Sequence, residues 1–169
     1  MSIAARFIKE QLENKIREQW LGSANENWFN LKPQRKGKVG SEIVKYMLEL
    51  EGYEVRDISD NGDLEYRKIG TKKWHKCEAK ASKVEFTTNG EWFWWNQIRP
   101  KQSWDSVALV GVYPDSVKVW WKEKADFNED DYRSGHVTGE KDDKSLLEVK
   151  LIKNSKRDNF HTWDLVYEG

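Results

Sequence analysis

The chain has 169 residues, which is enough for one domain with a substantial core and short for two. Charged residues make up 34% of the chain, yet its ten tryptophans argue against a disordered protein. The formal net charge is zero, which excludes a protein that is basic throughout, so any attraction to phosphates must come from local patches.

Residues 1–22 are predicted to form an N-terminal helix. Apolar residues recur there at helical spacing: Ile3, Phe7, Ile8, Leu12, Ile16 and Trp20. Ser2 is a suitable N-cap and Gly22 a suitable stop. We expect the apolar stripe to pack in the core of the domain, with a contact between two copies of the chain as the alternative.

Residues 22–40 are polar and contain Pro33, Gly37 and Gly40, so a loop is predicted there. Basic residues cluster within it: Arg35, Lys36 and Lys38. These side chains are candidate phosphate contacts, and the alternative is a charge run that is simply solvated.

A second helix is predicted from Ser41, a suitable N-cap, to Gly52, a suitable C-terminal stop. Glu42 lies in its first turn, where the helix dipole alone would favour an acidic residue. Residues 53–58 then form a predicted strand, and turn-forming residues lead from it to Asp63.

Residues 61–81 are predicted to fold into one hairpin, because both arms are rich in strand formers. Gly70 followed by Thr71 fits a two-residue type II′ loop, which favours glycine at its first central position. Such a loop pairs Ile69 with Lys72, and this pairing fixes the register of the whole hairpin.

In this register Asp63 lies directly opposite Glu78, and Lys80 lies two residues further on, on the same face. Like charges opposed across a sheet repel each other, and a divalent cation would offset the repulsion. Mg²⁺ suits carboxylate oxygens, and an ammonium beside it can polarise water or stabilise charge on a phosphate. The alternative is that the three side chains are solvated on an exposed face.

A helix, a buried strand and an edge strand are predicted after the hairpin. Residues 91–100 read as a short, aromatic-dense helix ended by a proline, with its tryptophans in the core rather than stacked on bases. Residues 106–112 are a continuous apolar run, typical of a central strand buried on both faces by helices. A turn at Pro114 and Asp115 leads to residues 117–122, which alternate like an edge strand.

Residues 125–169 are predicted to be a polar, loop-like C-terminal extension with a strand at 146–152. Apolar residues near its end predict that the tail returns to pack on the domain: Phe160, Trp163, Leu165 and Val166. His136 and His161 lack the spacing of metal ligands.

Cysteine usage and hydropathy bear on the location of the protein. Cys77 cannot form an internal disulfide and is expected on the buried face of its strand, which suits a reducing compartment. No signal peptide is visible, and no apolar run is long enough to span a bilayer. We therefore expect a cytoplasmic protein without a membrane contact.

The residues around the hairpin resemble a known family. Gly62-Asp63, a hairpin and then Glu78-Ala79-Lys80 look like the PD-(D/E)xK nuclease superfamily, with glycine in place of the family's proline. Gln97-Ile98-Arg99 resembles the Gln-Ile-Arg helix of small stand-alone restriction-like endonucleases. The resemblance implies an α/β (α+β) fold with a restriction-endonuclease-like core, a mixed central sheet in αβββαβ order flanked by helices. The chain would be one domain with its catalytic core at 37–124.

The resemblance also implies roles for individual residues. Those with an implied catalytic role are Asp63, Glu78, Lys80, Gln97 and Glu42. The implied metal ligands are Asp63, Glu78 and the Ala79 carbonyl, holding Mg²⁺ or, in its place, Mn²⁺. The basic side chains expected to contact DNA are Lys36, Lys38, Lys83, Arg99 and Lys101.

The expected function is that of a Mg²⁺-dependent DNA endonuclease of the type II restriction kind. One site ordinarily cuts one strand, and palindromic DNA has a two-fold axis, so a homodimer is expected. The alternatives are a phage, repair or homing nuclease of the same superfamily, or a non-catalytic module that binds nucleic acid, carbohydrate or a protein partner through its aromatic surface.

Overall fold

The computed structural model describes residues 3–58, 63–87, 90–93, 95, 98, 102–126 and 161–166. Two α-helices, α1 (Ile3–Trp20) and α2 (Pro33–Leu50), are separated by the 3-10 helix η1 (Glu26–Asn30), and a second 3-10 helix, η2 (Lys124–Asp126), comes later. The described strands are β1 (Tyr53–Asp57), β2 (Asp63–Lys68), β3 (His75–Lys83), β4 (Glu85–Thr87), β5 (Gly90–Trp92), β6 (Ser106–Val112), β7 (Ser116–Glu123) and β8 (His161–Val166). None of the described helices is both long and apolar enough to cross a membrane.

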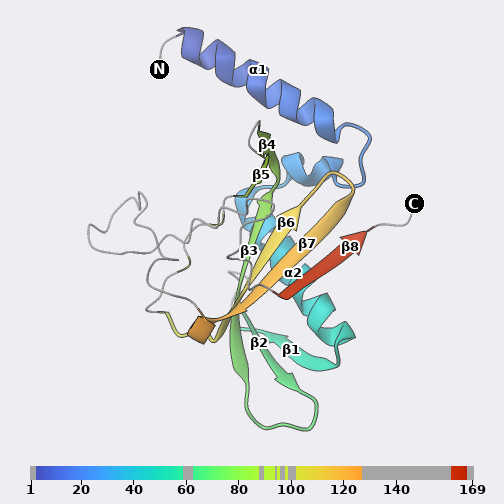
Figure 1. Ribbon diagram of the computed structural model, residues 1–169, viewed down its shortest axis with the longest axis vertical. Coiled ribbons are helices and arrows are strands. Elements are labelled where there is room, and N and C mark those ends of the chain that lie inside the picture. The colour runs from blue at the N-terminus through green and yellow to red at the C-terminus, as the bar shows by residue number, and fades with distance from the viewer. Residues whose placement is uncertain are drawn as a thin grey trace.

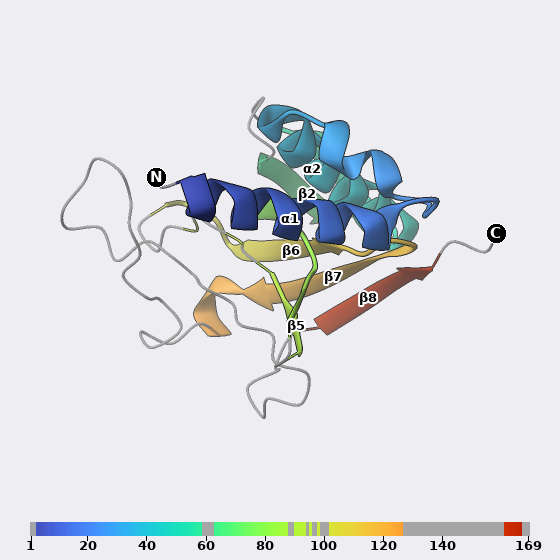
Figure 2. The same cartoon turned by 90° about the horizontal axis from the view of Figure 1, so that it is seen from above.

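Six of these strands form one mixed sheet in the order β1-β2-β3-β6-β7-β8 (Figure 1). Strands β3 and β6 run parallel, and the other neighbouring pairs in this sheet are antiparallel. Helix α2 lies over one face of the sheet and packs on β1, β2, β3 and β6 (Figure 2). The mixed α/β class expected from the sequence is therefore confirmed, and α2, β1, β2 and β3 follow one another in the expected order.

Helix α2 begins at Pro33, in the segment for which a loop was predicted. Pro33 occupies the first turn, where its missing N–H costs nothing. Ser41 is not the N-cap: it lies inside the helix, is buried, and donates its hydroxyl to the carbonyl of Lys38. Gly37 and Gly40 lie inside the helix and do not end it, and position 40 requires glycine because of a tertiary contact. A Cβ on Gly40 would lie 2.6 Å from the Cβ of Ala81 in β3, so glycine allows the helix to approach the sheet closely. Gly52, at φ +82°, follows the helix end as expected.

Helix α1 forms as predicted, but most of its apolar stripe does not pack in the core. Ile3 and Phe7 are 89% and 61% exposed, whereas Trp20 is fully buried and Ile16 packs against the core. The helix extends away from the sheet above β4 and β5 (Figure 1). The expectation of a core role is therefore correct for its C-terminal end and wrong for its N-terminal half.

The connection from β3 to β6 differs from the helix predicted at 91–100. The first part of that segment belongs to strand β5, and Phe93 and Trp95 are not helical. Their rings stack with centroids 4.8 Å apart and pack edge-on against Trp120 of β7. The indole N–H of Trp95 also donates to the carbonyl of Val110. Packing on the sheet thus outweighs local helix propensity, and the second helix of the αβββαβ order is not found among the described residues.

Strand β7 was expected at the edge of the sheet, and β8 pairs along it instead. The return of the tail to the domain is therefore confirmed as strand pairing. The strand predicted at 146–152 lies outside the described residues. Strand β6 is central and all seven of its residues are buried, as expected, although Phe93 and Trp95 rather than a helix lie against its second face.

Candidate carboxylate and lysine site

The hairpin of β2 and β3 has the register expected from the sequence: Asp63 pairs with Glu78. The predicted two-residue loop is wrong, however. Pairing stops at Tyr66 and His75, and a turn from Lys68 to Thr71 places Gly70 at its third position with φ +87°. The register survives because the apolar residues of both arms must reach the same buried face. They include Leu64 and Cys77, which are opposite each other and 0% and 1% exposed.

The two faces of β3 have different surroundings. Ala81 lies against Gly40 of α2, so the odd-numbered residues of β3 face that helix. Burial against this helix side raises the pKa of the Cys77 thiol far above its usual value, so the thiol stays protonated. Glu78 and Lys80 therefore project from the opposite face of the sheet.

Glu78 and Lys80 form an ion pair with 2.5 Å between Nζ and Oε1. Glu78 is 7% exposed, and the side chain of Lys80 is 23% exposed. A carboxylate so far removed from water needs hydrogen bonds and opposite charge, and Lys80 supplies both. The pair is thus held in one geometry at the middle of the sheet.

The donor set at this position suits a hard divalent cation. The backbone of Asp63 lies opposite that of Glu78, although the side chain of Asp63 is not part of the described structure. The described pairing of β3 with β2 ends at Glu78, one residue before Ala79, whose carbonyl was the third expected ligand. Two carboxylates and a carbonyl are oxygen ligands of the kind that Mg²⁺ binds. Among the side chains that are described, no group of three or more His, Cys, Asp or Glu could hold a metal.

The other predicted site residues are dispersed. Glu42 is exposed on α2, in the middle of the helix rather than in its first turn. Gln97, Arg99 and Lys101 lie outside the described residues. No distance in the structure therefore links Glu42 or Gln97 to the carboxylates, and their roles stay predictions.

The structure brings together two of the predicted DNA contacts, Lys36 of α2 and Lys83 of β3. Partial burial and, second, the charge of Lys83 lower the pKa of Lys36 below its usual value. Each ammonium lies over an aromatic ring, that of Lys36 5.7 Å from Trp28 and that of Lys83 5.9 Å from Phe29. Lys38 is exposed on α2. Two neighbouring cations that repel each other make a favourable place for an anion.

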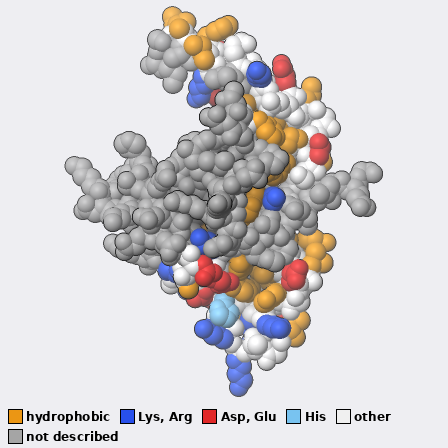
Figure 3. All heavy atoms as spheres, in the orientation of Figure 1, with side chains coloured by type: hydrophobic (Ala, Val, Ile, Leu, Met, Phe, Trp, Pro, Cys, Tyr) orange, Lys and Arg blue, Asp and Glu red, His pale blue; other side chains and the backbone are white. Residues whose placement is uncertain are grey.

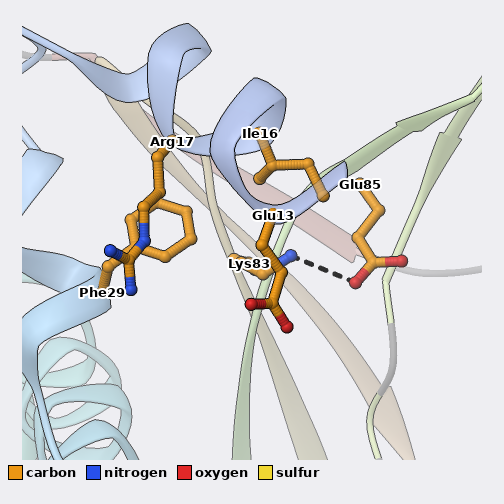
Figure 4. A pocket seen from close by; sticks show the side chains of 6 residues that line it. All are labelled: Glu13, Ile16, Arg17, Phe29, Lys83 and Glu85. Carbon is orange, nitrogen blue, oxygen red and sulfur yellow. Dashed lines mark hydrogen bonds and ion pairs between the residues drawn. The ribbon is translucent and has the colours of Figure 1, made fainter. Parts of the chain in front are cut away.

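Lys83 also lines a cavity of about 360 Å³ between α1, η1 and the strands (Figure 4). Its lining residues are Glu13, Ile16, Arg17, Phe29, Lys83 and Glu85. Lys83 is paired with Glu85 at 3.1 Å, so the negative charges in the lining of the cavity offset the positive ones. Because Lys83 is odd-numbered in β3, it lies on the α2 side, and the cavity does not share a face with Glu78.

Sequence reasoning missed two features on the face that carries Glu78. Lys122 of β7 is only 7% exposed and was predicted on an edge strand. In addition, the guanidiniums of Arg56 and Arg67 lie 4.2 and 4.5 Å from the ring of Trp74. These arginines also pair with Glu65 and Glu54, respectively, and acidic and basic side chains are mixed at this β1–β2 end of the molecule (Figure 3). Only the register of neighbouring strands reveals either feature.

The site therefore consists of an opposed pair of acidic positions and a lysine that is ion-paired with one of them. Basic residues flank it on both faces of the sheet. No protein-family model, curated protein or solved structure matches this chain.

Proposed function

We propose that the protein is a Mg²⁺-dependent endodeoxyribonuclease of the type II restriction kind, as its resemblance to the PD-(D/E)xK superfamily implies. The observation that carries the proposal is the pairing of Asp63 with Glu78, with Lys80 bound to Glu78 on the same face. Like charges opposed on a sheet are unfavourable unless something binds between them. Glu78 is 7% exposed, so at least this carboxylate is not on a solvated surface, and its burial supports the proposal of a metal site.

The proposed mechanism assigns a task to each of these residues. Asp63, Glu78 and the Ala79 carbonyl would hold Mg²⁺ or Mn²⁺, and the bound ion would activate a water and stabilise negative charge on the scissile phosphate. Lys80 orients the attacking water and donates hydrogen bonds to the phosphate oxygens as negative charge develops. The low exposure of Glu78 strengthens these electrostatic interactions, because little water screens them. Glu42 and Gln97 are proposed to position groups around this centre.

The proposed partner is DNA, bound through phosphate contacts. Lys36 and Lys83 lie close together on the α2 side of the sheet, and Lys38, Arg99 and Lys101 are the further proposed contacts. A net charge of zero makes such local contacts necessary, because the molecule as a whole does not attract a polyanion. Contacts of this kind orient the duplex without reading its sequence.

The burial of the aromatic residues disfavours the alternative of a non-catalytic binding module. Such a module needs exposed rings on which bases or sugars can stack. Among the described side chains, five tryptophans are buried: Trp20, Trp28, Trp95, Trp104 and Trp120. The described indoles therefore act mainly as core residues.

A DNA cleavage assay tests the proposal. We expect plasmid DNA to be cut in Mg²⁺ or Mn²⁺, to stay intact in EDTA, and to stay intact with Asp63→Asn because a ligand is lost. Glu65→Gln is the matched control: this carboxylate is two residues along β2 on the same face, paired with Arg56, and its loss should leave cleavage unchanged. Metal-independent DNA binding without cleavage would instead favour the binding module. Sequencing the product ends separates a restriction enzyme from the phage, repair and homing alternatives.

We propose a homodimer formed through the exposed apolar stripe of α1. Ile8 and Phe7 are 58% and 61% exposed, and burying them between two copies would contribute about 1.5–3 kcal/mol per side chain. Sedimentation equilibrium at micromolar concentration should show a dimer that Phe7→Gln dissociates. Lys9→Gln, on the other side of the helix, should leave it intact. The dimer would be contradicted by a wild-type protein that is monomeric both with and without DNA and still cuts both strands together.

A further inference from the structure

The cavity beside helix α1 is large enough for a small molecule. Its volume is about 360 Å³, and ligand sites in proteins usually measure about 300–1,000 Å³. Its walls come from α1, η1, β3 and β4 (Figure 4). Two of the lining residues, Glu13 and Arg17, are exposed, so a ligand can enter from solvent.

Phe29 and Ile16 supply the apolar part of the lining. Both are partly buried and pack against the core of the domain. The ring of Phe29 also contacts Trp20 edge-on, with 5.3 Å between the ring centroids, and this contact holds the ring in one orientation. A fixed aromatic ring next to an aliphatic side chain suits a flat group such as a nucleobase.

The charge that is left over in the lining is positive. Both acidic side chains have a cationic partner: Glu85 is paired with Lys83 at 3.1 Å, and Glu13 with Lys9 at 3.8 Å. The Arg17 side chain, by contrast, makes no ion pair or hydrogen bond with any residue that the structure describes. A guanidinium binds two oxygens of a phosphate or a carboxylate at once, so the cavity is suited to an anion.

A further cation close to the cavity favours phosphate over carboxylate. Lys36 also lacks an acidic partner among the described residues, and its pKa is lowered by partial burial and by the charge of Lys83. An anion that binds near both ammoniums relieves their repulsion. A phosphate monoester carries about two negative charges at neutral pH, so it offsets such a group of cations better than one carboxylate.

We propose that this cavity binds a nucleoside monophosphate unit, with the base against Phe29 and Ile16 and the phosphate bound by Arg17 and Lys83. The unit comes either from a free nucleotide or from a DNA strand, because the contacts are the same for both. This site goes beyond the proposed nuclease function and does not depend on it, since the cavity does not share a face of the sheet with Glu78.

Isothermal titration calorimetry of the full chain tests the site. The titrations are done in EDTA, so that the proposed metal-dependent cleavage does not occur. Deoxyadenosine 5′-monophosphate should bind tighter than deoxyadenosine or inorganic phosphate by about 10-fold or more, because each of these lacks part of the contacts. If inorganic phosphate binds as tightly as the nucleotide, the base makes no contact and the proposal is wrong.

Arg17→Gln should weaken binding of the nucleotide by about 10- to 100-fold, the effect of losing a charged hydrogen bond. Arg6→Gln is the matched control. Arg6 is exposed on the same side of α1, about three turns and about 16 Å before Arg17, and is paired with Glu10. Its loss should leave the affinity unchanged, and circular dichroism checks the folding of both variants.

A short single-stranded oligonucleotide, titrated in the same way, identifies the source of the unit. If Arg17→Gln weakens its binding, a DNA strand occupies the cavity. If the variant weakens binding of the mononucleotide alone, the ligand is a free nucleotide. If neither affinity depends on Arg17, or neither ligand binds, the proposal is overturned, whatever the cleavage assay shows. A wild type that binds the nucleotide but cuts no DNA would remove the nuclease proposal and uphold this one.

Discussion

Glu78→Gln and Lys80→Met are each expected to lose cleavage by about 10²-fold or more while the protein remains folded. Glutamine keeps the shape of Glu78 but removes the charge that would hold Mg²⁺ and that pairs with Lys80 at 2.5 Å. Methionine keeps the length of Lys80 but cannot stabilise charge that develops on the phosphate. Cleavage rates at saturating Mg²⁺, with circular dichroism as the check on folding, measure both effects.

Lys76→Met is the matched control for the lysine. Lys76 is four residues before Lys80 on the same strand and the same face, it is exposed, and its ammonium contacts the hydroxyl of Ser103. Its loss should change the rate little. If Lys80→Met cleaves DNA at the wild-type rate, Lys80 has no part in the mechanism, whatever the effect of Glu78→Gln on the rate.

Gly40→Ala is expected to destabilise the fold by ~1–3 kcal/mol, because it adds a methyl group where none fits. The new Cβ would lie 2.6 Å from the Cβ of Ala81, which is too short to be maintained, so α2 must move away from β3. The opposite result is expected for Gly37→Ala in the same helix. Apart from the backbone of its own helix, no atom of the described residues lies within 4 Å of its Cβ position, so the higher helix propensity of alanine should stabilise by up to ~1 kcal/mol. Urea denaturation measures both changes.

A compensating substitution identifies the cause of that destabilisation. Ala81→Gly removes the methyl group that clashes, so the double variant with Gly40→Ala should lose less stability than the two single variants together. If the losses in unfolding free energy of the two single variants simply add in the double variant, the strain does not arise from contact between these two methyl groups. Because Glu78 and Lys80 lie on the same strand as Ala81, Gly40→Ala should also slow cleavage, and the double variant should recover part of it.

The register of the site was predictable because it depends on residues close in the chain. Alternating burial in two adjacent arms fixes which residues oppose each other, so Asp63 and Glu78 pair even though the turn at Gly70 is not the expected one. The same local logic correctly located β1, β6 and the end of α2. The nuclease function itself stays a prediction.

The failures have a shared physical cause, which is contact between residues distant in the chain. Gly40 breaks helices in isolation, yet it is tolerated in α2 because Ala81 needs the space. Trp95 lies in a helix-like sequence, yet its indole binds the backbone of Val110. Lys122 is likewise buried, on a strand that pairs with a segment distant in the chain, β8. Propensity and spacing in one segment carry no information about partners of this kind.

The pairing of β8 with β7 has a consequence for solubility. Strand β7 carries Val117 and Val119, both buried, and without β8 its backbone N–H and C=O groups would lie open along one side. An uncovered apolar strand at a sheet edge is a template for pairing with another molecule, which leads to aggregation. The C-terminal strand therefore covers β7 and becomes the edge of the sheet in its place, and a chain cut short after η2 would expose β7, with its buried valines, at that edge.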